Sequence, residues 1–131
     1  MIHRGDPLEV FAAVDVALAK SGTTTLECAL AGVPMVVGYK AHPLTWWLAQ
    51  RLAEVSLAAQ PNLILGRMAF PELIQDACTA DALIAHAAPL FDESSAECRA
   101  QREAIAAVQR EVGGGGASAH AAEMVIDLVG V

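Results

Sequence analysis

Apolar residues along this chain form two kinds of pattern, short continuous runs and helical stripes. The runs at residues 14–19 and 34–39 contain several valines and a single charge, Asp15. Such runs are typical of strands in a parallel sheet that is covered on both faces. Between them, the pattern predicts a helix over residues 25–31, which Gly32 would end. Strand, turn, helix, glycine and strand form a βαβ unit, so the sequence predicts the α/β fold class.

The rest of the chain is predicted to be mainly helical. Asp6 and Pro7 are typical of a helix start, because Asp accepts hydrogen bonds from free amides and Pro fits the first helical position. Pro43 and Pro71 would begin two further helices, and Thr79 would cap another. The remaining predictions are a loop or short strand at 60–67, a long polar helix at 93–112, a glycine break at 113–116 and a last helix capped by Ser118.

Composition supports one folded domain. The chain has 131 residues, of which 55% are hydrophobic, and this share excludes a disordered chain. The net charge of −7 argues against nucleic acid as a partner, because phosphate binding needs clustered Lys and Arg. Residues 61–131 carry ten acidic and four basic groups, which is typical of solvated helix faces.

Neither a membrane span nor a disulfide framework is predicted. The longest stretch without Asp, Glu, Lys or Arg is shorter than the ~18 residues that a spanning helix needs. Acidic residues interrupt every apolar stretch near the start, so no signal peptide is expected. Cys28, Cys78 and Cys98 lie far apart and match no metal-binding spacing. They are therefore expected to be reduced thiols of a cytoplasmic protein.

The turn at residues 21–25 (SGTTT) is the main candidate for chemistry. Ligands of open α/β sheets bind at the carboxyl ends of strands, where helix N-termini present free amides. Gly22 would let the backbone approach a phosphate, and Glu27, one turn into the helix, would reach a ribose diol. The same residues also have an explanation without a ligand, since Thr24 and Glu27 match a capping box. From the residues alone, both interpretations stay open.

A longer string of residues indicates a family. Residues 19–40 (AKSGTTTLECALAGVPMVVGYK) resemble the C-terminal half of bacterial lipid-A-disaccharide synthases. The likeness continues through PLT at 43–45, PNLILGR at 61–67 and PELIQ at 71–75, and it covers roughly residues 5–130. A more distant resemblance is to the peptidoglycan lipid II N-acetylglucosaminyltransferase. Both are GT-B glycosyltransferases.

The resemblance implies an enzyme with two Rossmann-like halves and a cleft between them. Residues 1–112 would be part of the nucleotide-sugar-binding domain, a truncated parallel sheet flanked by helices, and residues 113–131 a glycine-rich hinge with a C-terminal helix. This half would bind UDP-2,3-diacylglucosamine. The other half would bind 2,3-diacylglucosamine 1-phosphate and supply the catalytic base. The products would be lipid A disaccharide 1-phosphate and UDP, and neither a cofactor nor a metal is implied.

Matching positions assign four residues of the first βαβ unit to the donor. Ser21, Gly22 and Thr23 would face the UDP diphosphate, and Glu27 would face the ribose. Such an arrangement suits the reaction, because UDP leaves as an anion that helix N-termini and neutral donors stabilise.

Five further residues are assigned in the same way. Asn62, Gly66 and Arg67 would shape the loop over the donor, while Glu72 and Gln75 would contact the donor from the following helix. Without the resemblance, Asn62 and Glu72 also fit ordinary roles, since Asn favours turns and Glu favours helix starts. No residue is assigned to catalysis or to a metal.

The sequence departs from the family at its beginning. The acceptor half and the Pro-Gly-Ser-Arg turn expected upstream are absent, so we predict that this chain alone transfers no sugar. The resemblance also implies peripheral contact with the inner face of the bacterial inner membrane and a homodimer that exchanges C-terminal helices about residues 113–116. Trp46 and Trp47 are candidates for the membrane contact, but Trp47 would equally fit the core and Trp46 would equally fit against a neighbouring helix. Two alternatives stay open: a non-catalytic α/β module that binds a nucleotide or a partner, and a GT-B enzyme for another UDP-sugar.

Overall fold

The computed structural model describes residues 7–41, 57–112 and 123–127. Residues 123–127 form a helical turn of their own. The other elements, in chain order, are α1 (Pro7–Phe11), β1 (Ala17–Lys20), α2 (Thr23–Leu30), β2 (Met35–Tyr39), α4 (Gln60–Leu65), β3 (Glu72–Ile74), the 3₁₀ turn η1 (Gln75–Ala77), α5 (Ala80–Ala87), the 3₁₀ turn η2 (Ala88–Phe91) and α6 (Ala96–Val112).

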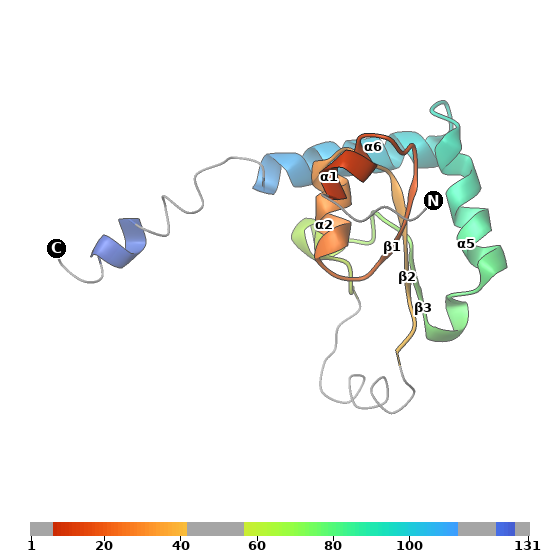
Figure 1. Cartoon of the computed structure of the whole chain (residues 1–131), viewed down its shortest axis with the longest axis horizontal. Helices are drawn as coiled ribbons and strands as arrows, with labels where there is room; N and C mark the ends of the chain where they lie inside the picture. Colours follow the sequence, from red (N-terminus) through yellow and green to blue (C-terminus); the bar gives the residue numbers. More distant parts are fainter. Residues whose placement is uncertain (1–6, 42–56, 113–122, 128–131) are drawn as a thin grey trace.

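The three strands form one parallel sheet with β2 in the centre (Figure 1). Ala17 pairs with Met35 on one side of β2, and Val37 pairs with Glu72 on the other. The helix α2 connects β1 to β2 as the crossover that a parallel pair requires. Within the described residues, the outer edge of β1 has no partner strand.

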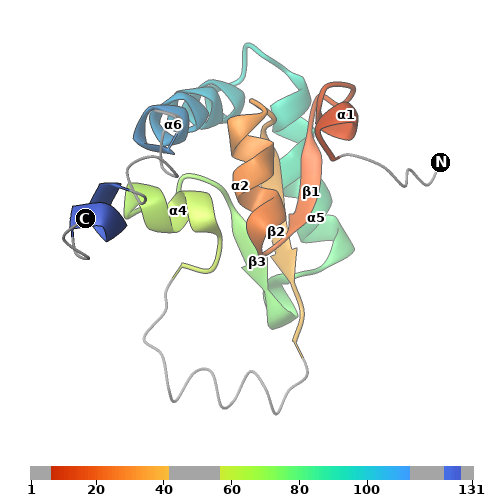
Figure 2. The same cartoon turned by 60° about the vertical axis from the view of Figure 1, so that its left-hand side comes forward.

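Helices cover both faces of the sheet (Figure 2). On one face, Met35 and Val37 of β2 pack in a cluster with buried residues of α2 and α6. On the other face, Val36 packs with Leu73, and with Leu90 of η2. Consecutive residues of β2 are thus buried on opposite faces, which explains its unbroken apolar run. The α/β class and the two strands of the βαβ unit are confirmed.

A buried amide fixes the long helix α6 to the central strand. Gln101 lies in the apolar stripe of α6 and is almost fully buried. Its Oε1 accepts a hydrogen bond from the Met35 amide (2.9 Å), and its Nε2 donates one to the Met35 carbonyl (3.0 Å). Both polar ends of the side chain thus have hydrogen-bond partners, and these bonds offset the free-energy cost of burying the amide.

Several predicted elements are corrected. The first strand begins at Ala17 rather than at residue 14, and residues 60–67 contain the helix α4 instead of a loop or strand. The helix predicted from Pro71 is instead the strand β3 and the turn η1. Pairing explains this change, because the Val37 amide donates to the Pro71 carbonyl (2.8 Å) and draws the segment into the sheet.

Other predictions are confirmed or fall outside the described residues. Thr79 caps α5, where its Oγ1 accepts from the Ala82 amide (3.2 Å). The helix expected from Pro43 with Trp46 and Trp47, the glycine break at 113–116 and the Ser118 cap lie outside the described ranges. No helix in the described part of the chain is both long and apolar enough to cross a membrane.

Candidate functional site

The candidate phosphate turn lies at the carboxyl end of β1, where α2 begins. Gly22 is the N-cap of α2 and has φ 145° and ψ −166°, a conformation essentially restricted to glycine. The helix therefore begins two residues earlier than a cap at Thr24 would place it, and the capping box does not form. No side-chain oxygen caps this end of α2 by accepting a hydrogen bond from its first backbone amides.

Two hydroxyl groups hold the turn in place. Thr25 is fully buried, and its Oγ1 donates to the Gly22 carbonyl (2.7 Å). Ser21 Oγ donates to the carbonyl of Ala58 (2.9 Å), which lies 37 residues further along the chain. The Ser21 hydroxyl therefore donates its hydrogen bond to the segment that leads into α4, rather than to an incoming ligand.

Glu27 lies one turn into α2, as predicted, and is partly buried. In the described part of the chain, its carboxylate has neither a hydrogen bond nor an ion pair. The next residue, Cys28, is buried, and burial together with the Glu27 charge raises the pKa of its thiol to about 11. Cys28 is therefore protonated at neutral pH and unsuited to act as a nucleophile.

Glu72 lies on β3 rather than on a helix, and three N–H groups converge on its carboxylate. Oε2 accepts from the Ala58 amide (2.7 Å), while Oε1 accepts from the Ala59 amide (3.0 Å) and from Asn62 Nδ2 (2.7 Å). Ala59 is the N-cap of α4, so the carboxylate stabilises the start of that helix.

Asn62 is fully buried and uses both ends of its side chain. Its Oδ1 accepts from the amides of Ala69 (2.8 Å) and Phe70 (2.9 Å), and its Nδ2 donates to the Phe70 carbonyl (2.8 Å) as well as to Glu72. Asn62 therefore fixes the loop between α4 and β3. Its contacts are all within the protein.

Gly66 and Arg67 lie at the end of α4. Gly66 is its C-cap in the left-handed conformation (φ 64°), and the Arg67 side chain is exposed.

Gln75 also has a left-handed backbone (φ 54°), which is uncommon for a residue other than glycine. Its side chain accepts from the Ala41 amide (2.7 Å) and donates to the Ala41 carbonyl (3.2 Å), so it fixes the end of β2.

Two lysines add positive charge at the same edge of the sheet. Lys20 is the last residue of β1 and Lys40 directly follows β2, and both border a cavity of about 320 Å³. The Lys20 ammonium lies over the Tyr39 ring, 5.7 Å from its centre. Sequence reasoning missed both lysines, although a basic residue at the end of each strand is a signal for an anionic ligand.

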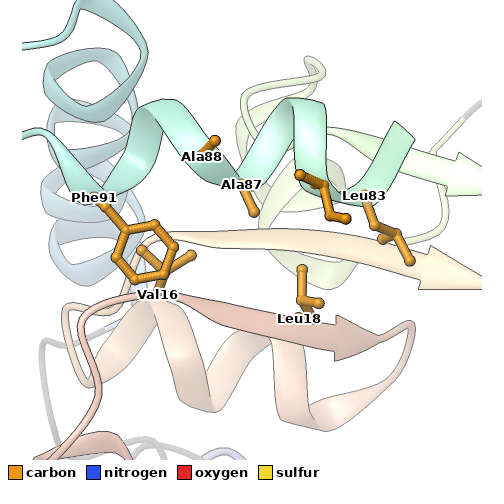
Figure 3. A pocket seen from close by; sticks show the side chains of 7 residues that line it. Val16, Leu18, Leu83, Ala87, Ala88 and Phe91 are labelled. Atoms are coloured by element: carbon orange, nitrogen blue, oxygen red, sulfur yellow. The ribbon is translucent and has the colours of Figure 1, made fainter. Parts of the chain in front are cut away.

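A second cavity, of about 500 Å³, has a different character (Figure 3). It lies between β1 and α5, where the side chains of Leu18 and Leu83 point toward one another across it. Its lining is entirely apolar and offers no polar side chain to a nucleotide. The complete lining is Val16, Leu18, Leu83, Ile84, Ala87, Ala88 and Phe91.

Comparisons with known proteins give the family. The family model described as lipid-A-disaccharide synthetase matches residues 1–123. The chain belongs to the lipid-A-disaccharide synthetase family. It is 50% identical over 90 residues to a lipid-A-disaccharide synthase of Pectobacterium carotovorum, covering 69% of this chain and 24% of the relative. The synthases of Aeromonas hydrophila and Pseudomonas fluorescens are each 38% identical over 126 residues, covering 86% and 96% of this chain.

The chain spans about a quarter to a third of the length of these synthetase relatives (24%, 33% and 32%). All nine residues assigned to the donor lie within the matched range 1–123. The structure brings Ser21, Asn62 and Glu72 into one hydrogen-bond network through Ala58, whereas Gln75 is bonded separately to Ala41. No cluster of three or more potential metal ligands occurs among the described residues.

Proposed function

We propose that this chain is the donor-binding portion, from the C-terminal half, of a GT-B lipid-A-disaccharide synthase. The whole enzyme would join UDP-2,3-diacylglucosamine to 2,3-diacylglucosamine 1-phosphate. The observation that carries the proposal is the family match over residues 1–123, which includes a glycine turn at the carboxyl edge of a parallel sheet. That edge is where open α/β folds bind nucleotides.

The residues of the turn suit a diphosphate. Gly22 has no Cβ, so a phosphate can approach the backbone, and the amides of Thr23 and Thr24 begin α2 without a side-chain cap. Lys20 and Lys40 raise the local positive potential. Glu27 has a carboxylate without a partner in the described residues, so it can accept hydrogen bonds from the ribose hydroxyls.

The chemistry of transfer explains why such groups are needed. The acceptor 6-hydroxyl attacks the anomeric carbon of the donor, the bond from this carbon to the diphosphate breaks, and UDP leaves with the electron pair. The proton of the hydroxyl passes to a base that we place in the other half of the enzyme. Amides and lysines near the diphosphate stabilise the negative charge that develops on it.

We also propose that residues 1–112 belong to one nucleotide-binding domain and that residues 113–131 would serve as a hinge with a terminal helix. The whole enzyme works at the cytoplasmic face of the inner membrane and contacts it peripherally. The assembled form is a homodimer. Each of these statements rests on the resemblance to lipid-A-disaccharide synthases, whose family model matches residues 1–123.

Calorimetric titration of the full chain with UDP tests the proposal. UDP should bind with one site per chain, and UMP should bind more weakly because it lacks the second phosphate. Glu27→Gln should weaken UDP binding about tenfold through the lost ribose contact. Glu103→Gln, an exposed change on α6, is the matched control and should leave binding unchanged. Absence of UDP binding by the folded chain would contradict the proposal.

A further inference from the structure

We propose that Glu72 is a positioning residue of the nucleotide site, which acts on the phosphate turn through Ala58 and Ser21 without touching the nucleotide. The inference rests on the proposed function, and it differs from the expectation that Glu72 contacts the donor from a helix. Glu72 is on β3, and each of its carboxylate oxygens accepts an N–H group of the segment that enters α4.

A continuous path of hydrogen bonds leads from Glu72 to the turn. The Ala58 amide donates to Glu72 Oε2 (2.7 Å), and the Ala58 carbonyl accepts from Ser21 Oγ (2.9 Å). Ser21 directly precedes Gly22, the N-cap of α2. Ala58 is thus held at its amide by Glu72 of β3, and at its carbonyl it holds the turn through Ser21.

The chemistry of the path explains why a carboxylate is needed. Ala58, Ala59 and Asn62 together direct three N–H groups at the two carboxylate oxygens of Glu72. Only an ionised carboxylate can accept hydrogen bonds at both oxygens without also carrying a donor. An amide in its place would direct an NH₂ group at one of these donors. Hydrogen bonds to an ionised acceptor are also stronger than those between neutral groups.

The position of Gly22 makes the turn dependent on such support. Glycine adopts positive φ values such as this 145° about as readily as negative ones. Contacts with neighbouring residues therefore decide the direction of the amides that follow Gly22. Thr25 fixes the helix side of the turn through its bond to the Gly22 carbonyl. Ser21 fixes the strand side, and its anchor is Ala58.

UDP titration of a double-mutant cycle tests this path. Glu72→Gln can keep an acceptor for Ala59 and Asn62 but loses the one for Ala58, while Ser21→Ala removes the bond to the Ala58 carbonyl. Each should weaken UDP binding about five- to tenfold, and the double variant should be little weaker than the weaker single variant. Ser21→Thr retains a hydroxyl and should bind UDP within about twofold of the wild type.

Two further measurements separate positioning from general stability. Thr79→Ala removes the cap of α5 and lowers stability, but it should leave UDP affinity unchanged. In amide NMR spectra without ligand, Glu72→Gln should displace the Gly22, Thr23 and Thr24 signals. Wild-type UDP affinity in folded Glu72→Gln, additive effects in the cycle, or undisturbed turn signals would overturn the inference. Absence of UDP binding by the wild type would refute the proposed function instead, and the ligand-free spectra would still decide the positioning role.

Discussion

The carboxyl edge of the sheet and the outer face of β1 present opposite kinds of surface. Beside the carboxyl end of β1, Ser21 and the neighbouring Asn62 and Glu72, near the start of β3, direct their polar atoms inward, to backbone groups and to one another. On the outer face, the apolar side chains of Leu18 and Phe91 line the cavity between β1 and α5 and are 61% and 66% exposed (Figure 3). We call the first region the carboxyl edge and the second the β1–α5 face.

The difference shows which region is complete within the described residues. Every buried side-chain nitrogen and oxygen in that part of the chain has a hydrogen-bond partner, so the geometry of the carboxyl edge is fixed without a ligand. The β1–α5 face leaves apolar surface in water beside the outer edge of β1, which pairs with no strand among the described residues. The polar groups of the first region are therefore preorganised, whereas the second region offers only nonspecific attraction to other apolar surfaces.

The largest expected effect follows from removing the buried amide of the carboxyl edge. Asn62→Leu leaves the amides of Ala69 and Phe70 and the Phe70 carbonyl without this partner, which should lower the free energy of unfolding by about 3–5 kcal/mol. Urea unfolding followed by circular dichroism measures the loss. Leu63→Ala, on the exposed side of the same helix, is the control and should cost less than about 1 kcal/mol. Equal losses would show that the network contributes little to stability.

A smaller effect is expected at the turn itself. Gly22→Ala places a Cβ on a backbone with φ 145° and should lower stability by about 1–3 kcal/mol. Gly32→Ala is a matched control, because Gly32 also has a positive φ (82°) but lies at the other end of α2. Both variants should lose stability in urea, and only Gly22→Ala should also lose UDP affinity. A parallel loss of affinity in Gly32→Ala would argue against a local role of the turn.

The smallest effect on stability is expected at the β1–α5 face. Leu18→Lys changes an exposed side chain and should alter the free energy of unfolding by about 0.5 kcal/mol or less. Its effect should be on association, because a charge on an open strand edge opposes edge-to-edge contact. Light scattering across a concentration series should show self-association of the wild type and less of it in Leu18→Lys. A wild type that stays monomeric would show that the exposed apolar side chains of this face do not drive self-association.

The sequence predicted the elements whose signals are local. The run at residues 34–39 contains β2, and Gly22 lies in the predicted turn between β1 and α2. Thr79 caps its helix through an amide three residues away, which is visible from spacing alone. In each case, neighbouring residues determine the conformation.

The elements that the sequence missed depend on distant partners. The sequence predicts a loop or short strand at 60–67, although Pro61 and Gly66 are also the start and end signals of the short helix α4. The start of α4 is fixed by Glu72, and Glu72 itself belongs to a strand only because β3 pairs with β2. For the same reason, spacing could not show that Ser21 and Ala58 meet 37 residues apart.

Amide NMR during a UDP titration of the full chain tests the central claim most directly. If the carboxyl edge binds the diphosphate, the signals of Gly22, Thr23 and Thr24 should move progressively and saturate, while those of Ile84 and Ala88 on the β1–α5 face stay in place. Shifts confined to the β1–α5 face, or no shifts at the turn at saturating UDP, would contradict a donor site at the carboxyl edge.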